Sequence, residues 1–205
     1  MNEADDEEVG NEGGARQGAE GTGTPKKPRF SPADSALLGI GQGYLGWTPL
    51  HAADAYATLA RGGVRLTPRV RSDAGAPAQQ RIDLGFKPQA VALALHGLER
   101  SVGEERGTGH HISFVAADGV TMRENTFNLP NVKVWGKSGT ADSGLKSVST
   151  EASLDHSWFV VLVGPEGGVP KYAVAVMVEN GGSGGRVAGP LCNQVLWQLR
   201  AEGYL

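Results

Sequence analysis

The 205-residue sequence is poor in several features that mark particular classes of protein. It has a single cysteine, Cys192, which excludes an internal disulfide. No apolar run approaches the length of a membrane span, and acidic residues follow Met1, so we expect neither a signal peptide nor an anchor in this chain. Lysine and arginine are scattered and the formal net charge is -3, which argues against a nucleic-acid-binding surface.

Residues 1–30 are rich in acidic residues and glycine and contain few apolar residues. Such a segment buries too little surface to offset its ordering entropy, so we expect it to be disordered or a long surface loop. An acidic tail that binds a partner is the alternative, and a solvated linker is the favoured reading. Residues 31–205 are then expected to form one domain, since 40% hydrophobic residues suffice for a core.

The hydrophobic pattern of residues 31–205 predicts an α+β domain, with an antiparallel sheet covered by helices. Helices are expected at about 48–62 and 88–103 and from Pro190 onward, because each has a start signal followed by apolar residues at helical spacing. Strands are expected at 64–70, 131–141, 157–164 and 172–179. The short connection between the last two predicts an antiparallel hairpin.

The chemistry-bearing side chains are concentrated in residues 131–141 (NVKVWGKSGTA). This strand ends in Lys137, Ser138, Gly139 and Thr140, which supply one positive charge, two hydroxyls and a glycine. A glycine inside a strand allows close approach of a ligand, and an exposed strand can pair with an extended peptide. These residues suit an acyl substrate that carries a carboxylate. A solvated lysine at the end of a strand is the alternative explanation of Lys137.

Lys-Ser/Thr-Gly on a strand is a signature of penicillin-binding transpeptidases and serine β-lactamases. With its flanking stretches, the sequence resembles the C-terminal part of the transpeptidase domain of a class B penicillin-binding protein, closest to the elongation-type, penicillin-binding protein 2-like enzymes. The resemblance covers roughly residues 32–205 and implies a partial β-lactamase/penicillin-binding-protein transpeptidase fold. The flanking stretches are 41–50 (GQGYLGWTPL), 55–63 (AYATLARGG), 107–109 (GTG), 156–159 (HSWF), 172–176 (YAVAV) and 179–184 (ENGGSG).

The resemblance also implies roles for the residues of the motif. Lys137 would be catalytic, placing its charge near the proton network and the substrate carboxylate, and Ser138 and Thr140 would donate hydroxyls to that carboxylate. The backbone N–H of Thr140 would be an oxyanion donor, and Gly139 would leave room for the substrate. The implied ligand is a peptidoglycan stem peptide or a β-lactam, with no cofactor or metal. The implied location is the outer face of the cytoplasmic membrane or the periplasm.

The sequence departs from the family at the nucleophile. The family's Ser-x-x-Lys motif is matched only by Ser143 and Lys146, in a polar loop after the Lys-Ser-Gly strand, whereas the family's nucleophile opens a helix far upstream. No serine stands two positions before an asparagine, so the family's Ser-x-Asn motif is absent too. We therefore expect this chain to be inactive alone, with the nucleophile half missing from it or supplied by another polypeptide. A non-catalytic scaffold or binding module is the alternative, and a β-lactamase fragment a weaker one.

Several other candidate residues are expected to have structural roles. His110, His111 and Glu124 suggest a metal site, but adjacent residues on a strand point to opposite faces, so surface or packed histidines are expected instead. His156 beside Ser157 could act as a base, and support of the Lys137 strand is favoured. Packing or turn roles are expected for Gln42, Tyr44, Trp47, Trp135 and the glycine-rich run 181–185.

Overall fold

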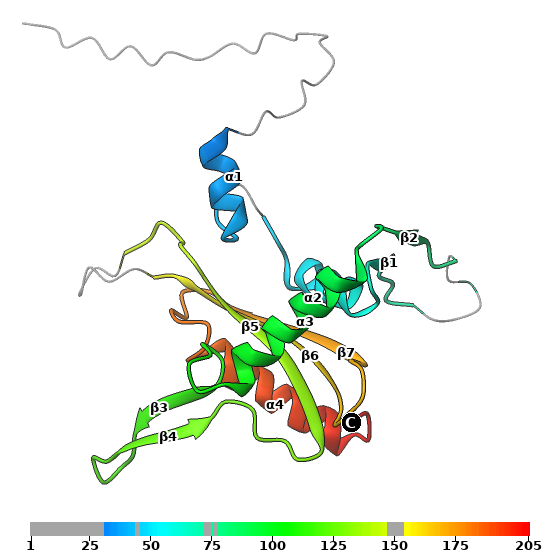
Figure 1. The fold of residues 1–205 in the computed structure, drawn as a ribbon. Helices are drawn as coiled ribbons and strands as arrows, with labels where there is room; N and C mark the ends of the chain where they lie inside the picture. Colours follow the sequence, from blue (N-terminus) through cyan, green and yellow to red (C-terminus); the bar gives the residue numbers. More distant parts are fainter. Residues whose placement is uncertain (1–30, 44–45, 72–74, 76–77, 147–153) are drawn as a thin grey trace, which may run out of the picture.

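The computed structural model describes residues 31–43, 46–71, 75, 78–146 and 154–205 (Figure 1). The acidic segment 1–30, Tyr44 and part of the loop after residue 146 lie outside these ranges. The helices are α1 (Pro32–Gly39), α2 (Pro49–Ala60), α3 (Pro88–Gly103) and α4 (Ala188–Ala201). The strands are β1 (Val64–Leu66), β2 (Arg81–Asp83), β3 (His111–Val115), β4 (Thr121–Asn125), β5 (Val132–Ala141), β6 (His156–Pro165) and β7 (Tyr172–Val178).

The centre of the fold is an antiparallel three-stranded sheet in the order β5-β6-β7. The predicted β6–β7 hairpin is confirmed, and so is the predicted strand 131–141, which begins one residue later, at Val132. In this register Lys137 stands opposite Val160, which in turn stands opposite Ala175 of β7. The candidate motif therefore lies on an outer strand of this sheet, because β6 is the strand that β5 pairs with.

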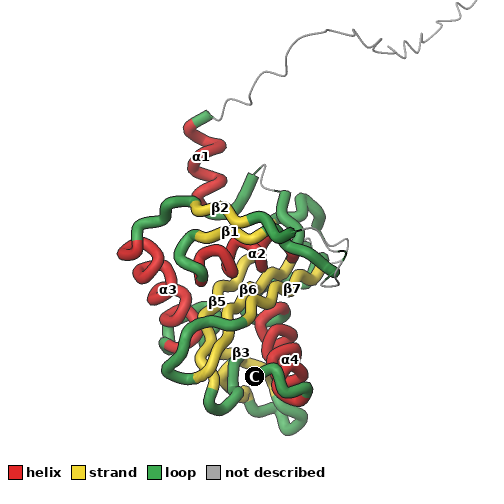
Figure 2. Tube along the Cα trace, turned by 90° about the vertical axis from the view of Figure 1, so that its right-hand side faces the viewer, coloured by secondary structure: helices red, strands yellow, loops and turns green. Residues whose placement is uncertain are grey.

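The core is built on β6, which is buried on both of its faces. Phe159, Val161 and Val163 are fully buried and cluster with Cys192 and Leu196 of α4. The alternate β6 residues point to the other face, on the side of α2. Figure 2 shows α3 beside β5 and α4 on the side of β7. The continuous apolar run of β6 thus has the physical cause that the sequence suggested, namely helices on both sides.

Local signals account for where the helices begin. Thr48 caps α2, since its hydroxyl accepts a hydrogen bond from the N–H of His51 at 3.3 Å and Pro49 fills the first helical position. Helix α4 begins at Ala188, two residues before the predicted Pro190. Helix α1 was not predicted. It begins with a capping box, but its apolar residues are not concentrated on one face. Within the described ranges, no helix has the length and apolar character needed to cross a membrane.

Two small antiparallel hairpins, β1–β2 and β3–β4, complete the described fold. Neither was predicted as a hairpin, and β1 is shorter than the predicted strand 64–70. Strand β4 is exposed along its length, so it has no alternation of apolar and polar residues to mark it. Its turn does have a recognisable signal: Asp118 precedes Gly119, which has φ +83°, and the Asp118 carboxylate accepts from the N–H of Val120 at 3.0 Å.

Candidate functional site

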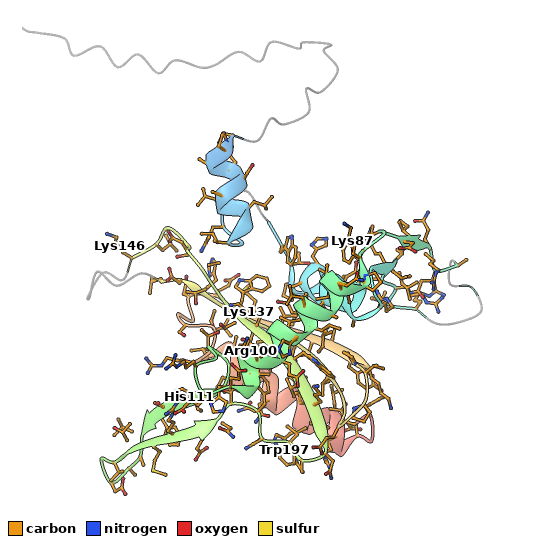
Figure 3. The ribbon with its side chains drawn as sticks, in the orientation of Figure 1. Lys87, Arg100, His111, Lys137, Lys146 and Trp197 are labelled. Atoms are coloured by element: carbon orange, nitrogen blue, oxygen red, sulfur yellow. The ribbon has the colours of Figure 1, made fainter. Side chains whose placement is uncertain are left out.

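The motif lies where β5 emerges from the core. Trp135 and Gly136 are buried, whereas the next side chain, Lys137, is exposed (Figure 3). The Lys137 ammonium donates a hydrogen bond to the carbonyl oxygen of Ser138 at 2.6 Å. Helix α3 contacts β5. The hydrogen bond to the Ser138 carbonyl holds the positive charge along the outer edge of the strand.

The backbone of the motif faces that outer edge. The carbonyl oxygen of Thr140 accepts a hydrogen bond from the side-chain amide of Gln42 at 3.1 Å, and that of Ser138 accepts from Lys137. In an antiparallel ladder, the N–H and C=O of one residue point to the same side. The N–H groups of Ser138 and Thr140 therefore point to the outer edge as well, where an extended ligand would lie. Among the residues expected to have only packing roles, Gln42 is thus placed at the site.

The Ser138 hydroxyl lies 2.8 Å from the hydroxyl of Thr108, thirty residues earlier in the chain. The glycines on either side of Thr108 explain its position. A Cβ on Gly109 would lie 2.6 Å from Cζ of Phe159, and one on Gly107 would collide with the carbonyl of Ser101. The Gly-Thr-Gly stretch can therefore pack tightly against the core and the end of α3, which brings a second hydroxyl to the motif.

The glycine-rich run 181–185 forms the other neighbour of the motif. The N–H of Gly184 donates to the hydroxyl of Thr140 at 3.3 Å. A Cβ on Gly184 would collide with the carbonyl oxygens of Gly139 and Trp158, so only glycine allows this approach. The run is the predicted turn, and it has the further effect of fixing the Thr140 side chain.

The side chains of the motif alternate between two faces of β5. Ser138 and Thr140 share one face with Thr108 and Gly184, whereas Lys137 and Gly139 belong to the other. The site predicted from sequence is therefore one strand segment with hydroxyls on one side, a cation on the other and peptide N–H groups between them. Such a surface can donate hydrogen bonds to a carboxylate or an oxyanion.

His156 and Ser157 occupy structural positions at the start of β6. The buried Ser157 hydroxyl donates to the carbonyl of Ser183 at 3.1 Å and accepts from the N–H of Ala188 at 3.0 Å. His156 Nδ1 accepts from the N–H of Asn180 at 3.1 Å. These bonds tie the glycine-rich turn and the start of α4 to β6, in line with the expected supporting role.

His110 and His111 lie closer together than the sequence argument allowed. His110 precedes β3 instead of lying within it, so strand alternation does not separate the rings, and their Nδ1 atoms are 3.4 Å apart. Arg123 reaches Nδ1 of His111 at 3.0 Å, and Glu124 stands opposite Ile112 instead. Partial burial, with the Arg123 charge second, lowers the pKa of His111. Over the part of the chain that the structure describes, no three potential ligands gather closely enough to hold a metal ion.

Ser143 and Lys146 lie in the loop that follows β5, not at the start of a helix. The Ser143 hydroxyl accepts a hydrogen bond from the N–H of Leu145 at 3.1 Å. A nucleophilic serine needs a base within hydrogen-bond reach. The described contacts of Ser143 are those of a turn residue.

Comparison with known proteins gives a consistent result. The profile of the family described as "Penicillin binding protein transpeptidase domain" matches residues 2–197. The chain is 30% identical over 173 residues to the peptidoglycan D,D-transpeptidase PbpA of Mycobacterium tuberculosis, covering 80% of this chain and 32% of that protein. It is 30% identical over 191 residues to the peptidoglycan D,D-transpeptidase MrdA of Haemophilus influenzae, covering 83% and 26%. The chain thus spans about a third or less of these relatives.

Solved structures show the same fold. Penicillin-binding protein 2 of Helicobacter pylori matches with a TM-score of 0.64 at 22% identity, over 87% of this chain and 29% of that one. Penicillin-binding protein A of M. tuberculosis, solved as a ceftriaxone acyl-enzyme complex, matches with a TM-score of 0.57 at 23% identity, over 80% and 35%. The α+β fold expected from the sequence is thereby confirmed as part of a penicillin-binding-protein transpeptidase fold.

Proposed function

Because the chain belongs to the penicillin-binding protein transpeptidase family, we propose that it is the C-terminal part of a peptidoglycan D,D-transpeptidase domain. In this proposal the strand segment 137–140 holds the carboxylate of a stem peptide, or of a β-lactam in its place. The observation that carries the proposal is the outer edge of β5, with its cation, two hydroxyls and outward-pointing backbone. The cross-linking reaction would serve the cell wall and cell shape, on the outer face of the cytoplasmic membrane or in the periplasm.

Acyl transfer requires a nucleophile, a base and donors aimed at the developing oxyanion. The N–H of Thr140 is proposed as one oxyanion donor, since it points away from β6. Ser138 and Thr140 are proposed to donate hydroxyls to the carboxylate, with Lys137 supplying the balancing charge. Gly139 leaves that part of the edge without a side chain. The bond from Gln42 to the Thr140 carbonyl would have to open before a substrate N–H could pair there.

The attacking serine is proposed to come from polypeptide outside this chain. The half of the domain that carries the Ser-x-x-Lys motif would be either another part of a longer protein or a separate chain that docks on this one. The length of the relatives is compatible with this, since the matched region makes up only 32% of PbpA and 26% of MrdA. The proposal needs no cofactor and no nucleic acid.

A fluorescent penicillin tests where the nucleophile lies. We expect no covalent adduct on this chain alone, measured by gel fluorescence and intact-mass spectrometry. In a chimera that joins residues 31–205 to the preceding part of the M. tuberculosis PbpA relative, we expect acylation on the serine of that preceding part.

Each possible result has a distinct meaning. An adduct on this chain alone, for example at Ser143, would contradict the proposed absence of the nucleophile. A folded chimera that never reacts, although PbpA itself reacts, would favour a non-catalytic scaffold or binding module. A Ser-to-Ala change at the nucleophile of the chimera is the matched control, and it should abolish labelling.

A further inference from the structure

A positively charged groove lies between α2, the segment after β1 and the beginning of β7. Its volume is about 450 Å³. It lies on the β7 side of the sheet, separated from the Lys137 motif by β6. We call it the basic groove and define it by Asp54, Arg61, Arg69, Gln79, Lys171 and Tyr172.

The charges of the basic groove do not balance among the described residues. Asp54 is the one carboxylate of its lining, and it is already shared by Arg65 at 3.1 Å and Arg61 at 3.9 Å. Within the described ranges, no carboxylate lies within ion-pair distance of the side chains of Arg69 and Lys171. The groove is therefore cationic in a chain whose net charge is -3.

A further arginine adds to this surface. Arg81 stands opposite Leu66 in the β1–β2 ladder, and directly opposed residues share one face of a ladder. Leu66 lines the basic groove, so the Arg81 side chain belongs to the same face. An occupant with several carboxylates, presented on a chain that can follow the groove, would complement these charges.

The same chain contains a segment of that kind. Residues 3–12 carry six acidic side chains and no basic one, and we call them the acidic segment: Glu3, Asp5, Asp6, Glu7, Glu8 and Glu12. About 24 residues separate its centre from α1, and an extended chain of that length reaches roughly 80 Å. A domain of about 175 residues has a radius of gyration of roughly 16 Å. The acidic segment can therefore reach the basic groove from any position of α1.

We propose that the basic groove is a docking site for the chain's own acidic segment, held by ion pairs to Arg69, Lys171 and Arg81. The contact is electrostatic and close to solvent, so each pair contributes little and the docking depends on several of them together. It weakens as salt increases, because the screening length falls from about 10 Å at 0.1 M to about 3 Å at 1 M ionic strength.

Zero-length carbodiimide cross-linking of the full chain tests the proposal. This reagent joins a carboxylate to an amine only where the two are in contact, and Lys171 provides the amine in the groove. The matched control amine is Lys146, which is exposed and lies far from β1 and β2 in Figure 3. We expect the acidic segment to be joined to Lys171 about fivefold more than to Lys146 at low salt, measured by peptide mass spectrometry.

Two variants make the test specific. Arg69→Glu should lower the Lys171 cross-link about fivefold and leave the Lys146 cross-link unchanged, and 1 M salt should do the same. Replacing the six acidic residues by their amides touches no described residue, and it should raise hydrogen exchange of backbone amides around the groove. Equal cross-linking at Lys171 and Lys146, insensitivity to Arg69→Glu, or a product found only between two chains would each overturn docking of the chain's own segment.

Discussion

Removal of the Ser157 hydroxyl tests how hydrogen bonds from β6 support the elements next to the motif. In Ser157→Ala, the donation to Ser183 and the acceptance from Ala188 are both lost. Loss of the bond to Ser183 costs about 1 kcal/mol, and leaving the N–H of the fully buried Ala188 without its partner costs about 1–3 kcal/mol. We therefore expect the free energy of unfolding to fall by about 2–4 kcal/mol.

Urea unfolding of the full chain, followed by tryptophan fluorescence, measures this change. On the usual size scaling, the thermal midpoint should fall by on the order of 10 °C. The matched control is Ser113→Ala on the exposed part of β3, which we expect to change stability by less than about 0.5 kcal/mol. If Ser157→Ala were as stable as the control, the hydroxyl would not be what ties α4 and the glycine-rich turn to β6.

Three further predictions follow from the described contacts. Gly109→Ala should lower the free energy of unfolding by about 1–3 kcal/mol, because the new Cβ meets Phe159; an unchanged thermal midpoint would contradict the packing argument. Burial raises the pKa of the Cys192 thiol to about 12, so its thiolate fraction near neutral pH should be about 10³-fold below that of an ordinary cysteine; fast reaction with Ellman's reagent in the folded chain would contradict this. The lowered pKa of His111 means that folding favours its neutral form, so stability should fall as the pH drops below about 6.5. Urea titrations at pH 5.5 and 7.5 give the difference in the free energy of unfolding between the two pH values. That difference should be smaller in His111→Gln than in the unchanged chain, and an identical difference would refute the prediction.

Strands β6 and β7 of the sheet were predictable because each is a nearly continuous run of apolar residues. The apolar runs of β6 and β7 predict strands whatever their surroundings, and the short connection leaves little choice but a hairpin. The β3–β4 hairpin is different, since its strands are exposed and polar and carry no such pattern. Asp118 and Gly119 were the available signal, because that dipeptide favours a tight hairpin turn.

The motif was predictable as a strand segment, but its neighbours were not. Gln42 and Thr140 are 98 residues apart, and the hydroxyls of Thr108 and Ser138 are 30 apart. Such contacts depend on where α3 and the loop after α1 are placed by packing, which no local pattern encodes. The His110 ring was misplaced for a related reason, because His110 and His111 were taken to lie on one strand, whereas β3 begins at His111.

The most direct test of the proposed site is to remove the charge of Lys137 and measure the rate of β-lactam acylation. Lys137→Met and Lys133→Met would be compared in the chimera with PbpA, as second-order rate constants with fluorescent penicillin. Lys133 is the matched control, since it lies on the same strand and face but pairs with Glu99 at 2.8 Å. We predict a loss of about 10²–10³-fold for Lys137→Met and less than about threefold for Lys133→Met. Equal rates for the two variants would contradict the proposal that the edge of β5 holds the carboxylate.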